Sequence, residues 1–232
     1  ESHYTETLLR FPYDYIGYEP PLYAPDPGPL PLLETGHPTF GCLNNPAKIN
    51  PLTIRLWSRL LREIPAARLI LKYKGMDDPV VRHRILGGFA ANGVDPNRIE
   101  VIGQTSHVEH LRTFRRIDVA LDPFPYSGGL STCEAIWMGV PVVTCPGEAF
   151  ASRHSLSHLS NAGITDTIAR DGNDYIRIAT HLASHPKELA ARREGLREQV
   201  NASPLCDLDA FADDFVRAIQ AISPRARRPA GL

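Results

Sequence analysis

The sequence lacks a surplus of charge of either sign. Its 232 residues include 25 Lys and Arg against 26 Asp and Glu, which gives a formal net charge of −1 at pH 7. A protein that binds nucleic acid or an anionic membrane through its overall charge carries a clear positive excess, so we expect neither partner. Hydrophobic residues make up 43% of the chain and charged residues 22%, as in an ordinary globular domain.

Long apolar runs, closely paired cysteines and acidic clusters are also scarce or absent. No run approaches the roughly 18 apolar residues of a membrane-spanning helix, and the first residues lack the pattern of a secretory signal. The sequence contains no C-x-x-C pair and no acidic cluster with ligand spacing, so we expect neither a metal nor a disulfide framework. A reducing, cytoplasmic setting is therefore expected. The four cysteines are Cys42, Cys133, Cys145 and Cys206.

Prolines and tyrosines are concentrated at the start of the chain. Residues 1–38 hold eight of the 21 prolines, interleaved with tyrosines. Such composition favours extended backbone, so residues 1–37 are predicted to be an arm or interdomain linker whose tyrosines dock on another surface. The chain begins without an initiator Met, and we expect it to be part of a longer protein. The tyrosines in question are Tyr13, Tyr15, Tyr18 and Tyr23.

From residue 38 onward, short apolar runs alternate with amphipathic segments. This alternation predicts a parallel sheet with helices on both faces, an α/β fold of the Rossmann-like kind. Ligands of such sheets bind beyond the carboxyl ends of the strands. Strands are predicted at 39–43, 67–73, 99–102, 117–122 and 140–145. Helices are predicted at 51–64, 79–91, 106–116, 132–138, 152–160, 174–183, 186–200 and 207–222. The first of them should face the core with a stripe of Leu52, Leu56, Leu60 and Ile64, with Trp57 and Leu61 beside it.

The most informative loop follows the fourth predicted strand. Gly128 and Gly129 end that strand, and Ser131 and Glu134 have the capping-box spacing that begins a helix. A glycine loop before a helix offers free N–H groups and the positive end of the helix dipole, which suit a phosphate or diphosphate. Glu134 could also accept hydrogen bonds from a ribose. A tight turn with a capping glutamate is the alternative, because a glycine loop alone is a weak signal.

The ends of the other strands add polar side chains to the same predicted edge of the sheet. An amine, two imidazoles and a glycine-rich helix start together offer partners for phosphate, an aromatic base and a ribose. Those residues are Asn44, Asn45 and Lys48 after the first strand, Gln104, Thr105, His107 and His110 after the third, and 126–134 after the fourth.

Three motifs resemble the O-GlcNAc transferase family, glycosyltransferase family 41, whose members are UDP-sugar enzymes of the GT-B architecture. The motifs are FGCLNNPAKINP (40–51), DPFPYSGGLSTCEAIWMGVPVVTCPGE (122–148) and ASPLCD (202–207). The resemblance implies that 38–204 form the Rossmann-like UDP-sugar-binding lobe, the C-terminal lobe of a GT-B enzyme. Residues 205–232 would form a helix and basic tail that pack toward an N-terminal lobe, with TPR repeats upstream in bacterial members.

The resemblance also implies an activity. Family members carry out an inverting, metal-independent transfer of GlcNAc from UDP-GlcNAc to Ser or Thr hydroxyls of a polypeptide. This chain would supply the donor half and bind UDP, whereas turnover would require the N-terminal lobe. Two alternatives stay open: a UDP-glucose-dependent protein N-glycosyltransferase that modifies asparagine, and a non-catalytic UDP-sugar-binding or interaction module.

Residue roles follow from the resemblance position by position. Lys48 matches the lysine that contacts the diphosphate and would act catalytically by stabilising the UDP leaving group. Asn45 stands where a glutamine faces the phosphates, and His110 where a histidine lies against uracil. Thr105 would offer its backbone to the base edge, and His107 replaces a uridine-contacting lysine.

The glycine loop departs from the family in one triplet. Gly129, Leu130 and Ser131 occupy the place of His-Thr-Thr in the animal enzymes, so backbone N–H groups and one hydroxyl remain while an imidazole is lost. Glu134 begins a signature, E-A-x-x-x-G-x-P-V-V-x-T, that implies a ribose contact. The positions implied to bind the sugar nucleotide around this loop are Tyr126, Gly128, Gly129, Leu130, Ser131 and Glu134.

No catalytic base is assigned to this chain. The family's candidates lie in the N-terminal lobe or on the donor phosphate. His154 and His158 lie in a predicted helix, and we interpret them as structural or interdomain residues, with acceptor contact as the lesser alternative.

Overall fold

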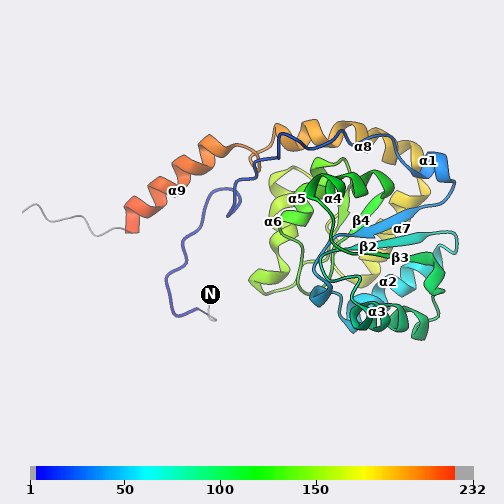
Figure 1. The fold of residues 1–232 in the computed structure, drawn as a ribbon. Helices are drawn as coiled ribbons and strands as arrows, with labels where there is room; N and C mark the ends of the chain where they lie inside the picture. The colour runs from blue at the N-terminus through cyan, green and yellow to red at the C-terminus, as the bar shows by residue number, and fades with distance from the viewer. Residues whose placement is uncertain (1–3, 223–232) are drawn as a thin grey trace, which may run out of the picture.

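The computed structural model describes residues 4–222. Its centre is a five-stranded sheet in which every neighbouring pair is parallel, in the order β3-β2-β1-β4-β5 (Figure 1). This confirms the predicted α/β, Rossmann-like fold. The strands are β1 (Thr39–Cys42), β2 (Arg68–Lys72), β3 (Ile99–Ile102), β4 (Val119–Leu121) and β5 (Val142–Val143).

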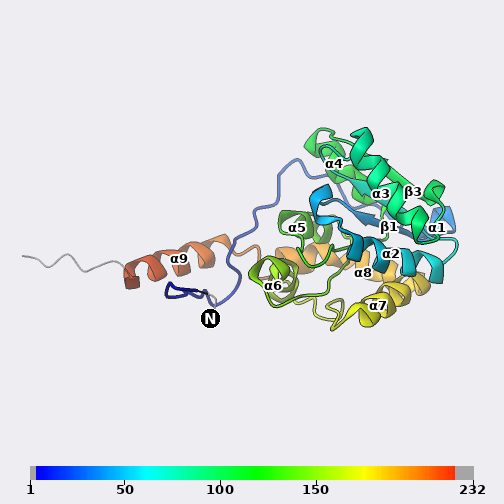
Figure 2. The same ribbon diagram turned by 90° about the horizontal axis from the view of Figure 1, so that it is seen from below.

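Helices cover both faces of the sheet, as the alternation predicts (Figure 2). Successive strand residues point to opposite faces, so Leu69 and Leu71 pack with one group of helices and Ile70 with the other. One face is covered by α2 (Pro51–Glu63), α3 (Pro79–Ala91) and α7 (Gly172–Ser184). The other is covered by α4 (His107–Thr113), α5 (Leu130–Trp137), α6 (His154–Asn161) and α8 (Pro186–Asn201).

The buried face of α2 agrees with the predicted one except at its first turn. Trp57, Leu60 and Leu61 are buried, and Leu56 and Ile64 pack against the core, whereas Leu52 is 44% exposed. The helix begins at Pro51 with the Asn50 side chain capping its first turn, which confirms the predicted start. The prediction was wrong for Leu52, because Ile54 and not Leu52 faces the core in the first turn of the helix.

Residues 14–37 of the N-terminal arm lie against the lobe and include the short helix α1 (Leu32–Thr35), whereas residues 4–13 are mostly exposed and extend away from the sheet toward α9 (Figure 1). Tyr18 belongs to the core and is 4% exposed. Arg193 of α8, 1% exposed, donates hydrogen bonds to the carbonyls of Pro27 and Gly28, and also to those of Ile117 and Phe114. The arm is therefore fixed by buried polar contacts as well as by packing.

The last described helix, α9 (Leu208–Ile222), extends away from the sheet (Figures 1 and 2). None of its residues is buried. Phe11 of the arm packs against Phe211 and Phe215, with ring centroids 5.9 and 6.2 Å apart. Most of the large apolar side chains of α9 are exposed, namely Leu208, Phe215, Val216, Ile219 and Ile222. The predicted basic tail, 223–232, lies outside the described residues.

Candidate functional site

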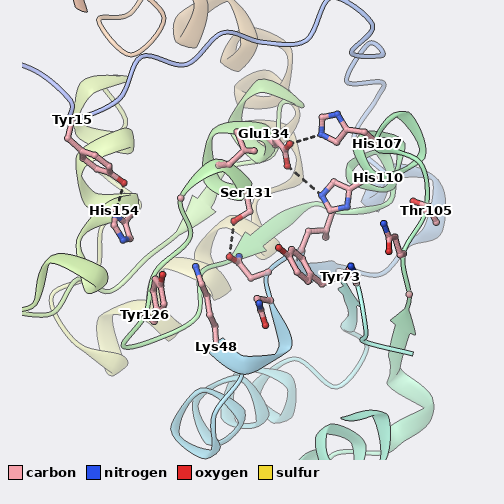
Figure 3. A pocket seen from close by; sticks show the side chains of 18 residues that line it. Tyr15, Lys48, Tyr73, Thr105, His107, His110, Tyr126, Ser131, Glu134 and His154 are labelled. Carbon is pink, nitrogen blue, oxygen red and sulfur yellow. Dashed lines mark hydrogen bonds and ion pairs between the residues drawn. The ribbon is translucent and has the colours of Figure 1, made fainter. Parts of the chain in front are cut away.

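A cavity of about 670 Å³ lies at the carboxyl ends of the strands (Figure 3). Its volume lies within the range of small-molecule sites. Most of the residues that line it lie in the loops after β1, β2, β3 and β4 or in the helices that follow those loops, so the sheet brings together positions that are far apart in sequence. Ten of the eleven predicted binding residues line it, namely Asn45, Lys48, Thr105, His107, His110, Tyr126, Gly129, Leu130, Ser131 and Glu134.

Helix α5 begins without the predicted capping box. Gly129 is the N-cap and no side chain caps the first turn. The Ser131 hydroxyl instead donates to Asn44 Oδ1 at 2.8 Å, and the Glu134 carboxylate contacts His107 and His110. Within the part of the chain that the structure describes, the N–H groups of Gly129, Leu130 and Ser131 have no acceptor. The start of α5 is thus available to an anionic ligand.

Glu134 is the centre of a polar cluster at one side of the cavity (Figure 3). Its side chain is 6% exposed, and its two oxygens lie 2.7 Å from His107 Nε2 and 3.5 Å from His110 Nε2. Tyr23 of the arm places its hydroxyl 2.9 Å from His107 Nδ1. A carboxylate has about four acceptor positions, so Glu134 keeps capacity for ligand hydroxyls. Thr105 lies beyond this cluster and is exposed.

Lys48 presents the cationic group nearest the glycine loop. Its Nζ donates to the Ser127 carbonyl at 2.7 Å and lies 4.0 Å from the centre of the Tyr126 ring. Burial lowers the pKa of the Lys48 ammonium, and the nearby Asp122 carboxylate opposes that shift. Asn45 caps the short turn that carries Lys48 by accepting a hydrogen bond from Ala47 N. A positive charge is therefore held beside the free amides of α5.

Comparison with known proteins assigns the fold and the motifs to one family. Residues 37–215 match the model of glycosyl transferase family 41. The chain belongs to this family. A Thermobaculum terrenum O-GlcNAc transferase mutant has a similar structure, with a TM-score of 0.79 and 34% identity over 96% of this chain and 44% of that chain.

Plant proteins named SPINDLY are also similar. The tomato protein, named "Probable UDP-N-acetylglucosamine--peptide N-acetylglucosaminyltransferase SPINDLY", is 36% identical over 96% of this chain and 24% of its own length. The chain thus spans about a quarter of the length of that relative. A sucrose-phosphate synthase from Thermosynechococcus elongatus, at 18% identity and a TM-score of 0.59 over 80% of this chain and 46% of that chain, shares the fold. This family-41 chain therefore has the fold of GT-B glycosyltransferases, as the motifs implied.

Gly128 is the predicted binding residue that does not line the cavity of this family-41 chain. Its N–H donates to Asp122 Oδ1 at 2.6 Å. A Cβ at position 128 would lie 2.6 Å from Thr132 Oγ1, so only glycine fits without a shift. Gly128 therefore anchors the loop on the side away from the cavity, and Gly129, Leu130 and Ser131 form the side that faces the cavity.

Asp122 fastens that loop to the sheet. Its carboxylate is 4% exposed and accepts hydrogen bonds from Gly128 N and from Thr144 Oγ1, both at 2.6 Å. Burial raises the pKa of the Asp122 carboxyl to about 6, although these hydrogen bonds oppose the shift.

Asp122 predicts a pH dependence of stability. An acid whose folded pKa exceeds its unfolded value, here 3.8, favours folding when protonated, and that stabilisation is lost as the pH rises through about 6. Between pH 4 and pH 7, wild type should lose on the order of 2–3 kcal/mol more stability than Asp122→Asn. Urea unfolding of both proteins across this range measures the difference. Parallel stability curves would show that Asp122 does not titrate there.

Sequence reasoning missed several residues that line the cavity. Tyr73 and Lys74 follow β2, and the rule that ligands lie at strand ends could have found them. Tyr15 and His154 also line it and contact each other, with Tyr15 OH 2.5 Å from His154 Nδ1. No sequence signal joins these two positions. His158, by contrast, is fully buried against Asp14, as its structural interpretation predicts.

Among the described residues, 4–222, no group of three or more His, Cys, Asp or Glu side chains could hold a metal ion. No helix in the same range is long and apolar enough to cross a membrane.

Proposed function

We propose that this chain is the donor-binding half of an inverting protein O-GlcNAc transferase. The proposed reaction moves GlcNAc from UDP-GlcNAc to Ser or Thr hydroxyls of a polypeptide. The names of the relatives indicate N-acetylglucosamine transfer to a peptide, or O-GlcNAc transfer, for those proteins. One observation carries the proposal: a single cavity combines the free amides of α5, Lys48 and the Glu134 cluster. These groups match, in chemical type, a diphosphate and a ribose.

In the proposed mechanism, the diphosphate lies at the start of α5 beside Lys48. The acceptor oxygen attacks the anomeric carbon while the bond from that carbon to the β-phosphate oxygen breaks. Negative charge then develops on the leaving UDP. Lys48 and the amides of Gly129 to Ser131 stabilise that charge, which is electrostatic work that a metal performs in other transferases.

The nucleoside is proposed to lie on the side of Glu134. The Glu134 carboxylate accepts hydrogen bonds from ribose hydroxyls, and the His110 imidazole lies against the base. His110 is well placed for this, because its ring is already fixed edge-on to Phe114, with centroids 6.1 Å apart. Thr105 then lies at the base edge.

The proposal extends to the rest of the protein. An N-terminal lobe, with TPR repeats upstream as the resemblance implies, would bind the acceptor and supply the base. The proposed location is cytoplasmic, on the basis of the cysteine pattern. The exposed apolar stripe of α9, including Phe215, Val216 and Ile219, supports a packing surface for that lobe. The full-length protein should transfer radiolabelled GlcNAc to polypeptide. UDP binding without any transfer by the full-length protein would instead favour the non-catalytic module.

Glu134 offers a test of the ribose contact. Hydrogen bonds to a charged group contribute about 1.5–3 kcal/mol, so wild type should prefer UDP over 2′-deoxy-UDP by about tenfold or more. In Glu134→Gln this preference should fall to about threefold or less. Calorimetric titration measures both ligands, and Glu109→Gln, an exposed carboxylate on α4, is the matched control. An unchanged preference in Glu134→Gln would place the ribose elsewhere.

A further inference from the structure

His154 lies at the side of the cavity opposite the Glu134 cluster. Figure 3 shows Glu134 with His107 and His110 on one side of the cavity. Ser131 and Lys48 follow in the middle, and Tyr126 and His154 lie on the other side. The His154 and Tyr126 ring centroids are 6.1 Å apart, and Lys48 Nζ lies over the Tyr126 ring. A nucleoside diphosphate sugar has its parts in the same linear order. If Glu134 holds the ribose and Lys48 the diphosphate, the hexose extends toward His154.

The arm fixes the imidazole of His154. Tyr15 OH lies 2.5 Å from Nδ1, and the edge of the ring contacts Phe150 with centroids 4.8 Å apart. The backbone N–H of His154 donates to Ser127 Oγ at 3.0 Å, which ties the start of α6 to the glycine loop. The ring is thus held by the arm, by the loop before α6 and by the glycine loop.

The chemistry of the Tyr15 and His154 pair determines which ring nitrogen carries the proton. Burial lowers the pKa of His154, so its imidazole is neutral at pH 7, and burial raises the pKa of Tyr15 to about 12, so its phenol keeps its proton. A phenol is a stronger donor than a neutral imidazole N–H, and an imidazole nitrogen is a stronger acceptor than a phenol oxygen. Tyr15 therefore donates to Nδ1, and the proton of the imidazole resides on Nε2.

Nε2 is left as an unused donor at the cavity. Within residues 4–222, no acceptor contacts it. His158, one turn later on the same helix, is different, because it is fully buried and its Nδ1 lies 2.7 Å from Asp14 Oδ2. The neighbouring ring of Tyr126 is 50% exposed and that of Phe150 51%. An N–H donor among exposed aromatic rings suits a hexose, whose hydroxyls accept hydrogen bonds and whose C–H faces pack on rings.

We propose that His154 is a specificity-determining residue that donates a hydrogen bond from Nε2 to the hexose of the donor, and that Tyr15 is the positioning residue that fixes its tautomer. This subsite rests on the proposed function, because it requires a UDP-sugar in the cavity. The arm then takes a direct part in the site at both ends. Tyr15 orients the His154 imidazole at the sugar end, and Tyr23 contacts His107 at the nucleoside end.

The test separates binding of the sugar from binding of the nucleotide. UDP and UDP-GlcNAc are titrated into wild type, His154→Phe and Tyr15→Phe, with Tyr13→Phe as the control, since Tyr13 is 56% exposed. Loss of one neutral hydrogen bond should weaken UDP-GlcNAc binding about threefold to tenfold in His154→Phe, with less loss in Tyr15→Phe. UDP binding should not change. His154→Gln, which keeps an N–H donor, should recover part of the loss.

A second measurement reads the tautomer directly. Nitrogen-15 NMR shifts of His154 should show a bare Nδ1 and a protonated Nε2 in wild type, and a mixture of tautomers in Tyr15→Phe. If His154 has only a structural role, its replacement should weaken binding of UDP and of UDP-GlcNAc equally. If His154 contacts only the acceptor, binding of both ligands should be unchanged. Either result overturns this inference but leaves the proposed function intact. Absence of UDP binding by the folded wild-type chain overturns the proposed function, and this inference with it.

Discussion

Replacing Lys48 with methionine is expected to weaken UDP binding by about 1.5–3 kcal/mol, the range for a lost hydrogen bond to a charged group. The ammonium lies between the Ser127 carbonyl and the Tyr126 ring, next to the free amides of α5. Methionine keeps much of the apolar stem and removes the charge. In the full-length enzyme, transfer should slow by about 10²–10³-fold, because the charge on the leaving UDP is greatest in the transition state.

Lys74→Met is the matched control for that variant. Lys74 lines the same cavity but is exposed, and a solvated cation contributes little. Calorimetric titration with UDP should therefore distinguish the two lysines. Equal losses of UDP affinity in both variants would mean that the overall positive potential of the cavity, and not a specific contact with Lys48, attracts the diphosphate.

Replacing Arg193 with methionine is expected to lower the free energy of unfolding by about 3–5 kcal/mol, the cost of breaking a buried charged network. Its guanidinium holds four carbonyls, two of them in the arm and two near β4. Burial lowers the pKa of Arg193 to about 10, so it remains charged at pH 7. Its loss would leave those carbonyls buried without their donor and would release the arm.

The neighbouring residue provides the control for Arg193. Arg192 pairs with Asp166 at the surface, where an ion pair contributes about 1 kcal/mol or less. Guanidinium chloride unfolding of Arg193→Met and Arg192→Met should therefore differ by several-fold in the loss of stability. Similar small losses in both would contradict the view that the arm is an integral part of the lobe.

The sheet and the edge that carries the cavity could be predicted from sequence because both depend on local pattern. Alternating apolar runs and helix starts such as Asn50-Pro51 specify the elements, and the parallel sheet then brings the strand ends together. That rule, with the motif positions, is why Lys48, His110 and Glu134 could be named before their geometry was known. Their roles toward a sugar nucleotide remain predictions.

The details that could not be predicted depend on contacts between distant residues. The spacing of Ser131 and Glu134 is that of a capping box, but Asn44 and the histidines of α4 provide closer partners once the chain folds. The contact between Tyr15 and His154 joins positions 139 residues apart. Proline-rich composition predicts an extended arm, yet it carries no information about which surface the arm covers.

Titration of this chain with UDP, alongside GDP and ADP, tests the central claim most directly, namely that the carboxyl edge of the sheet binds the uridine diphosphate part of a donor sugar. We expect binding of UDP that is tighter than that of either purine nucleotide and that is lost or weakened in Lys48→Met. No binding of UDP by the folded chain, or tighter binding of GDP or ADP, would contradict the account.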